Sequence, residues 1–534
     1  MTQQACIVSQ LGLTFPHQIL FQNLNFSLYP HQASALIGQN GQGKSLLMQL
    51  LQGFQSENFQ SSGQIIWNLA YAYLPQFYRL QAQNIAQALG VEDLHQAFQR
   101  IKHSLGSLED YESVEGAWHL PSEWENSLTQ ANLPTDLDFP TIKLSEGQKT
   151  RLALCALFQK KDHYLLLDEP SNHLDQASRL WLQQSMLKHP AGVLVISHDR
   201  NLLEHMQHIY ALNVHGIQHI HGNYKVYQQH INLQTKALNQ TVEQQKRQLK
   251  QLKQQQHQSL MKAQKRQHQG QRLRENTSQA KILLDFKKEQ SGQSLAKLKD
   301  QQNRQVLAAQ QQLSDARNQQ VHVKYQKLQF ISSPHKTGEL IRFNNYILPF
   351  ASQSPIHFSL KAGEKLHLLG NNGAGKSTLL KMIAHQKFTD NNQVFITGHV
   401  VYLDQNFSFL DPKCNAIENL KAFNAIYSDT EWRNLLGQLR LGGDKAILAV
   451  EHLSGGEKLK IALLALSQSE HTIDLLLLDE PENHLDIDSR ELLAGTIQDF
   501  SGAVILVSHD SHFVEDCGIE MSYELIPFFE DNII

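Results

Sequence analysis

Cysteine is scarce in this chain of 534 residues. The four cysteines, Cys6, Cys155, Cys414 and Cys517, stand far apart in the sequence and form no C-x-x-C pair. Neither a disulfide framework nor a zinc knuckle is therefore indicated, and a reducing compartment is the default expectation.

Long apolar runs are also missing. No apolar stretch approaches the roughly 20 residues that a membrane-spanning helix needs. The first residues, Met1-Thr-Gln-Gln, do not combine a basic start with an apolar run, as a secretory leader would. We therefore expect no integral membrane segment and a cytoplasmic protein.

Proline is absent from positions 230 to 323, inside a segment rich in Gln, Lys and Arg. Sparse apolar residues recur there at helical spacing in two groups, and the stretch between them, about Gln267 to Gly292, contains the breakers Gly270, Asn276 and Gly292. This pattern predicts an antiparallel helical hairpin with arms of about 40 residues, each roughly 60 Å long. The alternative is an unstructured linker, which the composition favours less. The apolar residues are Ile231, Leu238, Val242, Leu249, Leu252 and Leu260 in the first group, and Leu295, Leu298, Val306 and Leu313 in the second.

The net charge of −4 hides an uneven distribution. From Lys225 to Lys327 there are 20 Lys or Arg against 6 Asp or Glu, a local balance of +14 that leaves −18 for the rest of the chain. A basic arm on an acidic body indicates a polyanionic partner. Taken alone, such a run is more often a well-solvated spacer, so its interpretation depends on the motifs on either side.

The sequence contains two copies of one set of motifs. The first copy is Gly38-Gln-Asn-Gly-Gln-Gly-Lys44-Ser45, then Gln76, Leu144-Ser-Glu-Gly-Gln148, Leu165-Leu-Leu-Asp168-Glu169 and Ser197-His198-Asp199. The second copy is Gly370-Asn-Asn-Gly-Ala-Gly-Lys376-Ser377, then Gln405, Leu453-Ser-Gly-Gly-Glu457, Leu476-Leu-Leu-Asp479-Glu480 and Ser508-His509-Asp510. The order is the same in both, which indicates a duplicated domain.

The spacing between the copies locates an insertion. The second copy follows the first by 332 positions at the phosphate loops but by 311 at the Asp-Glu pairs. The first module therefore holds about 20 extra residues between Gln76 and Leu144. We predict a first module over residues 1–224 with an insert around 77–143, a linker over 225–327, and a second module over 328–534.

The glycine-rich loops have a phosphate-binding pattern. Their glycines let backbone N–H groups turn toward phosphate oxygens at the positive end of the following helix. Lys44 and Lys376 would reach the β- and γ-phosphates, and Ser45 and Ser377 would each take one Mg²⁺ position.

The apolar runs before Asp168 and Asp479 predict buried parallel strands that end in acids at the carboxyl edge of a sheet. These two aspartates suit the Mg²⁺ shell, and the adjacent Glu169 and Glu480 would orient or deprotonate the attacking water. A lone Asp-Glu pair is more often a solvated strand end, but here both pairs continue as Pro-x-Asn-His-Leu-Asp.

These motifs, in this order, resemble the ATP-binding cassette ATPases. Two cassettes in one chain, a basic helical linker and the repeated Asp-Glu-Pro-(Ser/Glu)-Asn-His-Leu-Asp look specifically like the ABC-F family. The resemblance covers essentially the whole chain. It implies an α/β fold with two P-loop ATP-binding cassette domains joined by a long α-helical hairpin. It also implies a Mg²⁺-dependent ATP hydrolase that binds the ribosome at the tRNA exit site, with the linker reaching rRNA and the P-site tRNA.

The resemblance also implies roles for individual residues. The cassettes of one monomer would close head to tail, each ATP lying between one phosphate loop and the Leu-Ser motif of the other cassette, the signature (residues 144–148 and 453–457). His198 and His509 would contact the γ-phosphate, and Gln76 and Gln405 would sense Mg²⁺ and the attacking water. The nucleotide-contacting set of the first cassette is Gly38, Gln39, Asn40, Gly41, Gln42, Gly43, Lys44, Ser45, Leu46 and Gln76, with Ser145, Gly147 and Gln148 serving the opposite site. The set of the second is Gly370, Asn371, Asn372, Gly373, Ala374, Gly375, Lys376, Ser377, Thr378 and Gln405, with Ser454, Gly455, Gly456 and Glu457 serving the first site. The Mg²⁺ set is Ser45, Gln76, Asp168, Ser377, Gln405 and Asp479.

Adenine stacking needs an aromatic side chain upstream of each phosphate loop. Phe15 fits the first loop, and Phe350 fits the second, with Tyr346 as the alternative. All three could equally be ordinary core residues.

One residue departs from the family pattern. Glu146 replaces the first glycine of a signature and places a carboxylate near a helix start that should face a γ-phosphate. We expect weaker closure on ATP at the site containing Lys376. Both glutamates are present, so neither site is degenerate by sequence.

The insert and the precise role stay open. Residues 77–143 hold 10 Asp or Glu against 4 Lys or Arg, a poor composition for binding phosphate. The insert is either a reduced arm that meets a protein or a helical subdomain with an enlarged loop, and we favour the second.

The function predicted is ATP-driven regulation or rescue of translation, with antibiotic protection of the ribosome as one form. The alternatives are a DNA-associated repair or chromosome ATPase and, less favoured, the ATPase subunit of a transporter.

Overall fold

The computed structural model describes residues 4–16, 18–76, 80–172, 174–213, 216–275, 299–316, 338–349, 355–371, 373–388, 393–404, 406–483 and 485–525. The chain forms two compact units. One combines Met1–Val226 with Gln326–Ile534, and the other is Tyr227–Tyr325. The first unit holds both motif sets and the second holds most of the predicted linker, while the finer domain limits stay a prediction.

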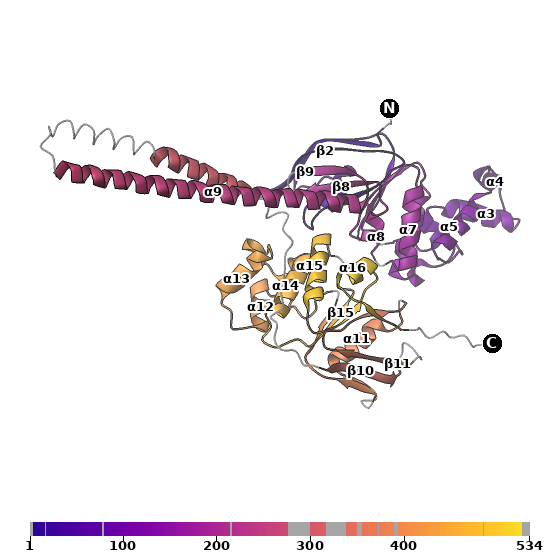
Figure 1. The fold of residues 1–534 in the computed structure, drawn as a ribbon. Helices are drawn as coiled ribbons and strands as arrows, with labels where there is room; N and C mark the ends of the chain where they lie inside the picture. Colours follow the sequence, from indigo (N-terminus) through magenta and orange to yellow (C-terminus); the bar gives the residue numbers. More distant parts are fainter. Residues whose placement is uncertain are drawn as a thin grey trace. The chain divides into compact units, whose positions relative to one another are not determined.

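The first module is built on two sheets (Figure 1). A six-stranded sheet has the order β5-β6-β7-β3-β8-β9 and is parallel except for β9, which pairs antiparallel with β8. A three-stranded antiparallel sheet has the order β2-β1-β4. The strands are β1 Cys6–Phe15, β2 Gln18–Leu28, β3 Ala33–Ile37, β4 Gln60–Trp67, β5 Tyr71–Leu74, β6 Tyr164–Asp168, β7 Val193–Ile196, β8 His208–Asn213 and β9 Gly216–His221. The helices are α1 Lys44–Leu51, α2 Ile85–Leu89, α3 Glu92–Lys102, α4 Leu108–Ser113, α5 Leu120–Gln130, α6 Glu146–Phe158, α7 Gln176–Lys188 and α8 Arg200–Leu203, with a 3₁₀ turn at Thr141–Lys143.

The second module repeats this plan. Its five-stranded parallel sheet, β14-β15-β16-β12-β17, matches β5-β6-β7-β3-β8 strand for strand, and its antiparallel sheet has the order β11-β10-β13. The strands are β10 Glu339–Tyr346, β11 Ile356–Lys361, β12 Lys365–Leu369, β13 Val394–Ile396, β14 Val400–Leu403, β15 Leu475–Asp479, β16 Ala503–Val507 and β17 Met521–Glu524. The helices are α11 Lys376–His385, α12 Ala416–Phe423, α13 Asp429–Gln438, α14 Gly455–Ser467, α15 Ile487–Asp499 and α16 Ser511–Asp516, with 3₁₀ turns at Gly443–Ala446 and Val450–His452. The duplication predicted from the motif order is confirmed.

The strands that carry the acids are the most buried parts of each sheet. All five residues of β6 (YLLLD) and of β15 (LLLLD) are buried. Helices cover parallel sheets on both faces, so such strands are apolar throughout instead of alternating. The predicted buried parallel strands are confirmed, and each delivers its aspartate to the carboxyl edge.

The extra residues of the first module form helices. Between α2 and α5 lie α3 and α4, joined by an ion pair between Arg100 and Asp110, whereas only residues 424–428 separate α12 from α13. This region is helical, and its assignment to a helical subdomain with an enlarged loop stays a prediction. Several large apolar side chains of this region are at least half exposed: Leu105, Leu108, Tyr111 and Trp118.

The predicted linker is helical in both described parts (Figure 1). Helix α9 runs over Tyr224–Glu275, and residues 299–316 form a second helical segment. Gln256 bonds to Asn303 and Ser259 to Gln302, and nearer the base Val242 packs with Leu313 and Ala316. This register is antiparallel, so the two arms of the hairpin are confirmed.

The predicted break at Gln267 and Gly270 is wrong, because α9 continues to Glu275. One glycine costs a helix interior about 1 kcal/mol, and the flanking Gln, Lys and Arg residues are good helix formers that outweigh it. The other predicted breakers, Asn276 and Gly292, and the apolar Leu295 and Leu298 lie outside the described residues. Among the described residues, no helix is both long and apolar enough to cross a membrane.

Replacing Val242 with Asp should loosen the linker hairpin. The side chain of Val242 is 2% exposed, so the new carboxylate would be buried without a partner. Amide hydrogen exchange over residues 299–316 should accelerate by about tenfold or more. Leu233→Asp is the control, because Leu233 is 67% exposed on the same helix. Equal exchange in both variants would contradict the packing described here.

Candidate nucleotide-binding sites

Each phosphate loop enters its helix through a glycine in the left-handed region. Gly43 (φ 88°) precedes α1 and Gly375 (φ 92°) precedes α11, and neither helix start has a side-chain cap. Glycine adopts such a φ freely, whereas other residues are strained there. The uncapped N–H groups and the positive helix end therefore face the loop, an arrangement that binds phosphate.

The loop lysines are held by the loops themselves. Lys44 Nζ donates to the carbonyl oxygens of Gly38 and Gln39 at 2.7 and 3.2 Å. In the second module, Lys376 Nζ donates to Gly370 at 2.6 Å and to the next carbonyl at 3.1 Å. Burial lowers the pKa of both lysines, and nearby carboxylates oppose that shift.

The strand-end aspartates lie beside the phosphate loops. Asp168 hydrogen-bonds with Ser45, the residue after the loop lysine. Tyr402 donates from its hydroxyl to Asp479 Oδ2 at 3.0 Å, and Tyr73 is hydrogen-bonded to Asp168 in the same way. Burial, with the charge of Asp168, raises the pKa of Tyr73 to about 12, so this tyrosine stays a donor at neutral pH.

The two glutamates have an unusual backbone conformation. Glu169 has φ 50° and Glu480 has φ 46°, in the left-handed region. Their N–H groups donate to Ile196 and Val507 in the neighbouring strands, each at 2.9 Å. Non-glycine residues held at positive φ cost free energy and cluster at functional sites. Here the turn aims each carboxylate away from its strand.

Each glutamate lies close to the histidine of its own module's Ser-His-Asp motif, which we call the switch segment (residues 197–199 and 508–510). His198 Nε2 lies 3.4 Å from Glu169 Oε1, and His509 Nε2 lies 3.3 Å from Glu480 Oε1. The two pairs differ in exposure. The side chains of His198 and Glu169 are 8% and 11% exposed, whereas those of His509 and Glu480 are 26% and 23% exposed.

This difference gives the glutamates opposite pKa shifts. Burial raises the pKa of Glu169 to about 8, with Lys44 opposing and Asp168 adding to the shift. The pKa of Glu480 lies below its usual value, because its hydrogen bond with His509 outweighs burial. Burial also lowers the pKa of His198 well below its usual value. At neutral pH, Glu169 is mostly protonated and Glu480 is ionised.

Contacts between the two modules lie on the side of the more buried site. Asn40 N donates to Asp486 Oδ2 at 2.9 Å, and Gln39 Nε2 donates to Asp488 Oδ2 at 2.5 Å. Asp486 closes the second Asp-Glu-Pro-Glu-Asn-His-Leu-Asp run and caps α15. A Cβ on signature residue Gly456 would lie 3.7 Å from Asp486 Oδ1. The phosphate loop of the first module thus contacts Asp486 and Asp488 of the second, and Asp486 lies next to the signature residue Gly456.

Two arginines strengthen this contact. Arg490 Nη1 donates to the main-chain oxygen of His198 at 2.9 Å and to Asp510 Oδ2 at 3.1 Å. Arg200 pairs with Glu491 at 3.0 Å and also with Asp516. Both hold the switch segment of the first module against α15 and α16 of the second.

The signature helices begin alike. Ser145 and Ser454 cap α6 and α14 through reciprocal hydrogen bonds with Gln148 and Glu457. Glu146, at the first position of α6, is 76% exposed in its side chain and forms an ion pair with Lys149 at 2.8 Å. Its charge is therefore partly neutralised by its own helix.

The other predicted site residues are found in different settings. Gln76 is exposed at the end of β5, and Phe15 is partly buried against Phe59. Tyr346 is 1% exposed and packed among Phe343 and Phe388, so it is a core residue and offers no face to an adenine. Phe350, Asn372 and Gln405 lie outside the described residues.

Three residues were missed by the motif analysis. Tyr73 and Tyr402 stand three positions before the two predicted glutamines, a repeated pattern that could have revealed them. Glu482 is 3% exposed and accepts a hydrogen bond from Ser508, beside the switch histidine. Burial raises the pKa of Glu482 to about 7. The first module has Ser171 at this position, so no repeat marked it.

The arrangement fits a nucleotide triphosphate with Mg²⁺. Asp168 Oδ1 is buried without a hydrogen-bond partner among the described residues, which suits a cation next to Ser45. A Cβ added to Gly41 or Gly373 would meet nothing within 4 Å, so both loops have room for phosphate. Mg²⁺ held by Asp168 and Ser45 would offset the negative charge that develops in phosphoryl transfer.

Comparison with known proteins agrees with this geometry. The profile of the family described as "ABC transporter" matches residues 21–172 and 354–483. The chain is 27% identical to the "Ribosome protection protein VmlR" of Bacillus subtilis over 93% of this chain and 82% of the relative. It is 24% identical to the "Energy-dependent translational throttle protein EttA" of Mycobacterium tuberculosis over 93% of this chain and 87% of the relative. A solved structure titled "RNase-L Inhibitor" has a TM-score of 0.50 at 16% identity, covering 99% of this chain and 91% of the other, and supports the tandem fold.

The fold and the duplicated sites define a tandem ATP-binding cassette ATPase whose cofactors are ATP and Mg²⁺. The chain belongs to the ABC transporter family through both of its modules. Its relatives place it among the ABC-F proteins.

The opposite pKa shifts predict different pH profiles for the two sites. In the Glu480→Gln variant, ATP hydrolysis depends on Glu169, whose pKa is raised to about 8. The hydrolysis rate should therefore rise about tenfold from pH 7 to pH 9, because this base becomes ionised over that range. In Glu169→Gln, hydrolysis depends on Glu480, already ionised, so the rate should stay flat over that range. Steady-state rates at saturating ATP would measure this, and parallel profiles would show that the sites do not differ.

Replacing Glu146 with Gly should strengthen nucleotide binding at the Lys376 site. The change removes a carboxylate from the first turn of α6, an effect of about 0.3–1 kcal/mol, or roughly two- to fivefold in KM. KM for ATP should be measured in a Glu169→Gln background, in which ATP hydrolysis depends on the Lys376 site. Lys149→Gln is the matched control, because it leaves Glu146 without its ion-pair partner and should raise KM. Unchanged KM in both variants would refute the role of Glu146.

Proposed function

We propose that this ATPase binds the ribosome and couples its nucleotide cycle to the position of the basic hairpin in the tRNA path. ATP holds the two cassettes closed, and hydrolysis reopens them and releases the protein. The observation that carries this proposal is the basic helical hairpin inserted between two complete ATPase modules of one chain. The useful output is a conformational change, and phosphoryl transfer to water supplies its free energy.

The same proposal assigns the site residues. Lys44 and Lys376 turn from their loop carbonyls to the phosphates, and Asp168 and Asp479 join Ser45 and Ser377 around Mg²⁺. Glu169 and Glu480 orient water beside His198 and His509. The signature residues Ser454 and Gly456 complete the Lys44 site, and Ser145 and Gly147 complete the Lys376 site. This pairing is supported at the first site by the bond between Asn40 and Asp486, next to Gly456.

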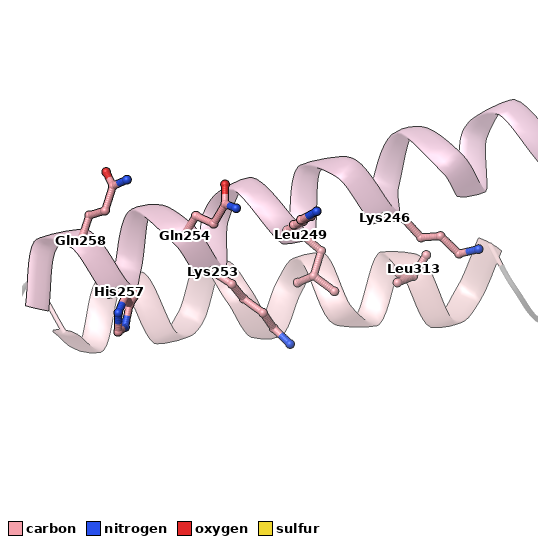
Figure 2. Close-up of a pocket in the computed structure, with 8 residues that line it drawn as sticks. Lys246, Leu249, Lys253, Gln254, His257, Gln258 and Leu313 are labelled. Atoms are coloured by element: carbon pink, nitrogen blue, oxygen red, sulfur yellow. The ribbon is translucent and has the colours of Figure 1, made fainter.

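The hairpin has a surface suited to RNA. Figure 2 shows Leu249 of α9 facing Leu313 on the second arm, with Lys246 and Lys253 at the edges of the groove between the arms. Apolar contact thus joins the arms, and the lysines remain available to phosphates. Lysines that neutralise phosphates contribute affinity without sequence specificity and make it fall steeply with salt.

The named relatives point the same way. A ribosome protection protein and a translational throttle protein both align along nearly the whole chain. We infer the same class of partner here, at the tRNA exit site and the P-site tRNA, and a cytoplasmic location. A DNA-associated cassette ATPase would share the polyanion preference, and a transporter ATPase would leave the basic hairpin without a role.

The double variant Glu169→Gln, Glu480→Gln should bind ATP without hydrolysing it and remain on ribosomes. On a sucrose gradient we expect it to co-migrate with ribosomes when ATP is present and to stay at the top when ATP is left out. Retention on DNA without ribosome association would favour the alternative.

Two matched variants separate the parts of the proposal. In the same double background, Lys44→Ala with Lys376→Ala removes the phosphate contacts and should abolish the ATP dependence. Lys246→Gln with Lys250→Gln and Lys253→Gln keeps good helix formers but removes three charges from the groove. It should weaken ribosome binding by about tenfold or more at moderate salt while leaving free ATPase activity unchanged.

A further inference from the structure

Three histidines gather on the β8–β9 hairpin of the first module. Both strands are labelled in Figure 1. His208 begins β8 and lies directly opposite His221, the last residue of β9. His219 precedes His221 by two residues, so their side chains share one face of the strand. The antiparallel register therefore brings all three imidazoles to the same face.

The ring nitrogens are close enough to share one ion. His208 Nδ1 lies 3.1 Å from His219 Nε2, and one ligand nitrogen from each of the three rings lies within 4.8 Å of the others. Ring centroids are 4.4 Å apart for His219 and His221 and 5.0 Å apart for His208 and His221. In a tetrahedral site with metal–nitrogen bonds of about 2.05 Å, neighbouring ligand nitrogens are about 3.3 Å apart.

Burial keeps the rings of His208 and His219 neutral, and a stacked tyrosine orients His219. Burial and the proximity of the other imidazoles lower the pKa of His208, and they lower that of His219 to about 4. A neutral imidazole is the form that binds metal. Tyr210 stacks flat on His219, with ring centroids 4.5 Å apart and planes 4° apart, and its hydroxyl donates to Ser27 at 2.6 Å. This stack fixes the His219 ring.

We propose that His208, His219 and His221 form a binding site for a divalent transition-metal ion of the zinc class. Three imidazole nitrogens suit Zn²⁺, with water in the fourth position, whereas Mg²⁺ and Ca²⁺ prefer oxygen ligands. His208 and His219 are already at ligand spacing. His221 is exposed, so its side chain is free to rotate toward the other two.

The position of the site assigns it a structural role. His208 pairs with Ser34 at the start of β3, whereas the phosphate loop follows the opposite end of β3. An ion here would cross-link β8 and β9, and α9 begins three residues after His221. The metal would therefore brace the strands from which the linker helix departs and would take no part in hydrolysis.

The test uses the full-length chain without a polyhistidine tag, in a buffer with excess Mg²⁺. Cys414 is replaced by Ser, because its thiol is the one that is partly exposed and could bind the metal. Titration with Co²⁺ should give the visible absorption of a tetrahedral site at a single equivalent per chain, and Zn²⁺ should displace it. His219→Ala and His221→Ala should each weaken Zn²⁺ affinity by at least about tenfold in competition with a chromophoric chelator.

His205→Ala is the matched control, because His205 is an exposed histidine close by in the sequence whose Nδ1–H donates to the main-chain oxygen of Asn201. It should leave affinity unchanged. Zn²⁺ should also raise the thermal midpoint of the parent but not of His221→Ala, which is exposed and should fold normally. No tetrahedral Co²⁺ spectrum in the parent, or equal Zn²⁺ affinity in parent and cluster variants, would overturn the proposal.

Discussion

The structure depends on holding carboxylates at the ends of strands that are otherwise entirely apolar. Charged groups are costly to bury unless cations or hydrogen bonds compensate for the lost water. Here the leucines of β6 and β15 fix the strand ends inside the sheet, and the loop lysine, a tyrosine and a histidine surround each acid pair. At these strand ends Glu169 and Glu480 have a positive φ, and their N–H groups donate to Ile196 and Val507 of the neighbouring strands. The reactive geometry is therefore a result of core packing.

The two copies of this arrangement are not equivalent. Contacts from Asp486, Asp488 and Arg490 cover the site of the first phosphate loop, and its glutamate and histidine are correspondingly more buried. The same residue types then carry opposite pKa shifts, since desolvation dominates in one site and a histidine hydrogen bond in the other. The duplication keeps the same residue types in both sites, whereas the contacts between the modules set how buried each glutamate is and in which direction its pKa shifts.

Much of this could be predicted from the sequence, for identifiable reasons. Phosphate loops and buried acid-ended strands have local signatures, and the hairpin has a periodicity and a lack of proline that follow directly from helix geometry. The predicted break at Gly270 is wrong, because the helix formers around this glycine outweigh its low helix propensity. Tyr346 could not be distinguished from a binding aromatic, since only packing shows that its ring is covered. Glu482 and the His208, His219 and His221 cluster depend on register and burial, which single-sequence patterns do not contain.

Arg490 has a consequence beyond stabilising the interface. One guanidinium nitrogen is bonded both to the main chain of His198 and to the side chain of Asp510, so a single group touches the switch segments of both modules, whereas its counterpart Arg179 bonds to Asp199 and Leu174 within its own module. Any ligand that moves one switch changes the free energy of the other through this shared donor. Coupling between two binding sites is reciprocal by thermodynamic necessity, so any effect of one nucleotide on the other site through Arg490 would be equal in both directions. The bond from Arg490 to His198 has no equivalent in the bonds of Arg179, so the two modules contribute differently to the contact between their switch segments.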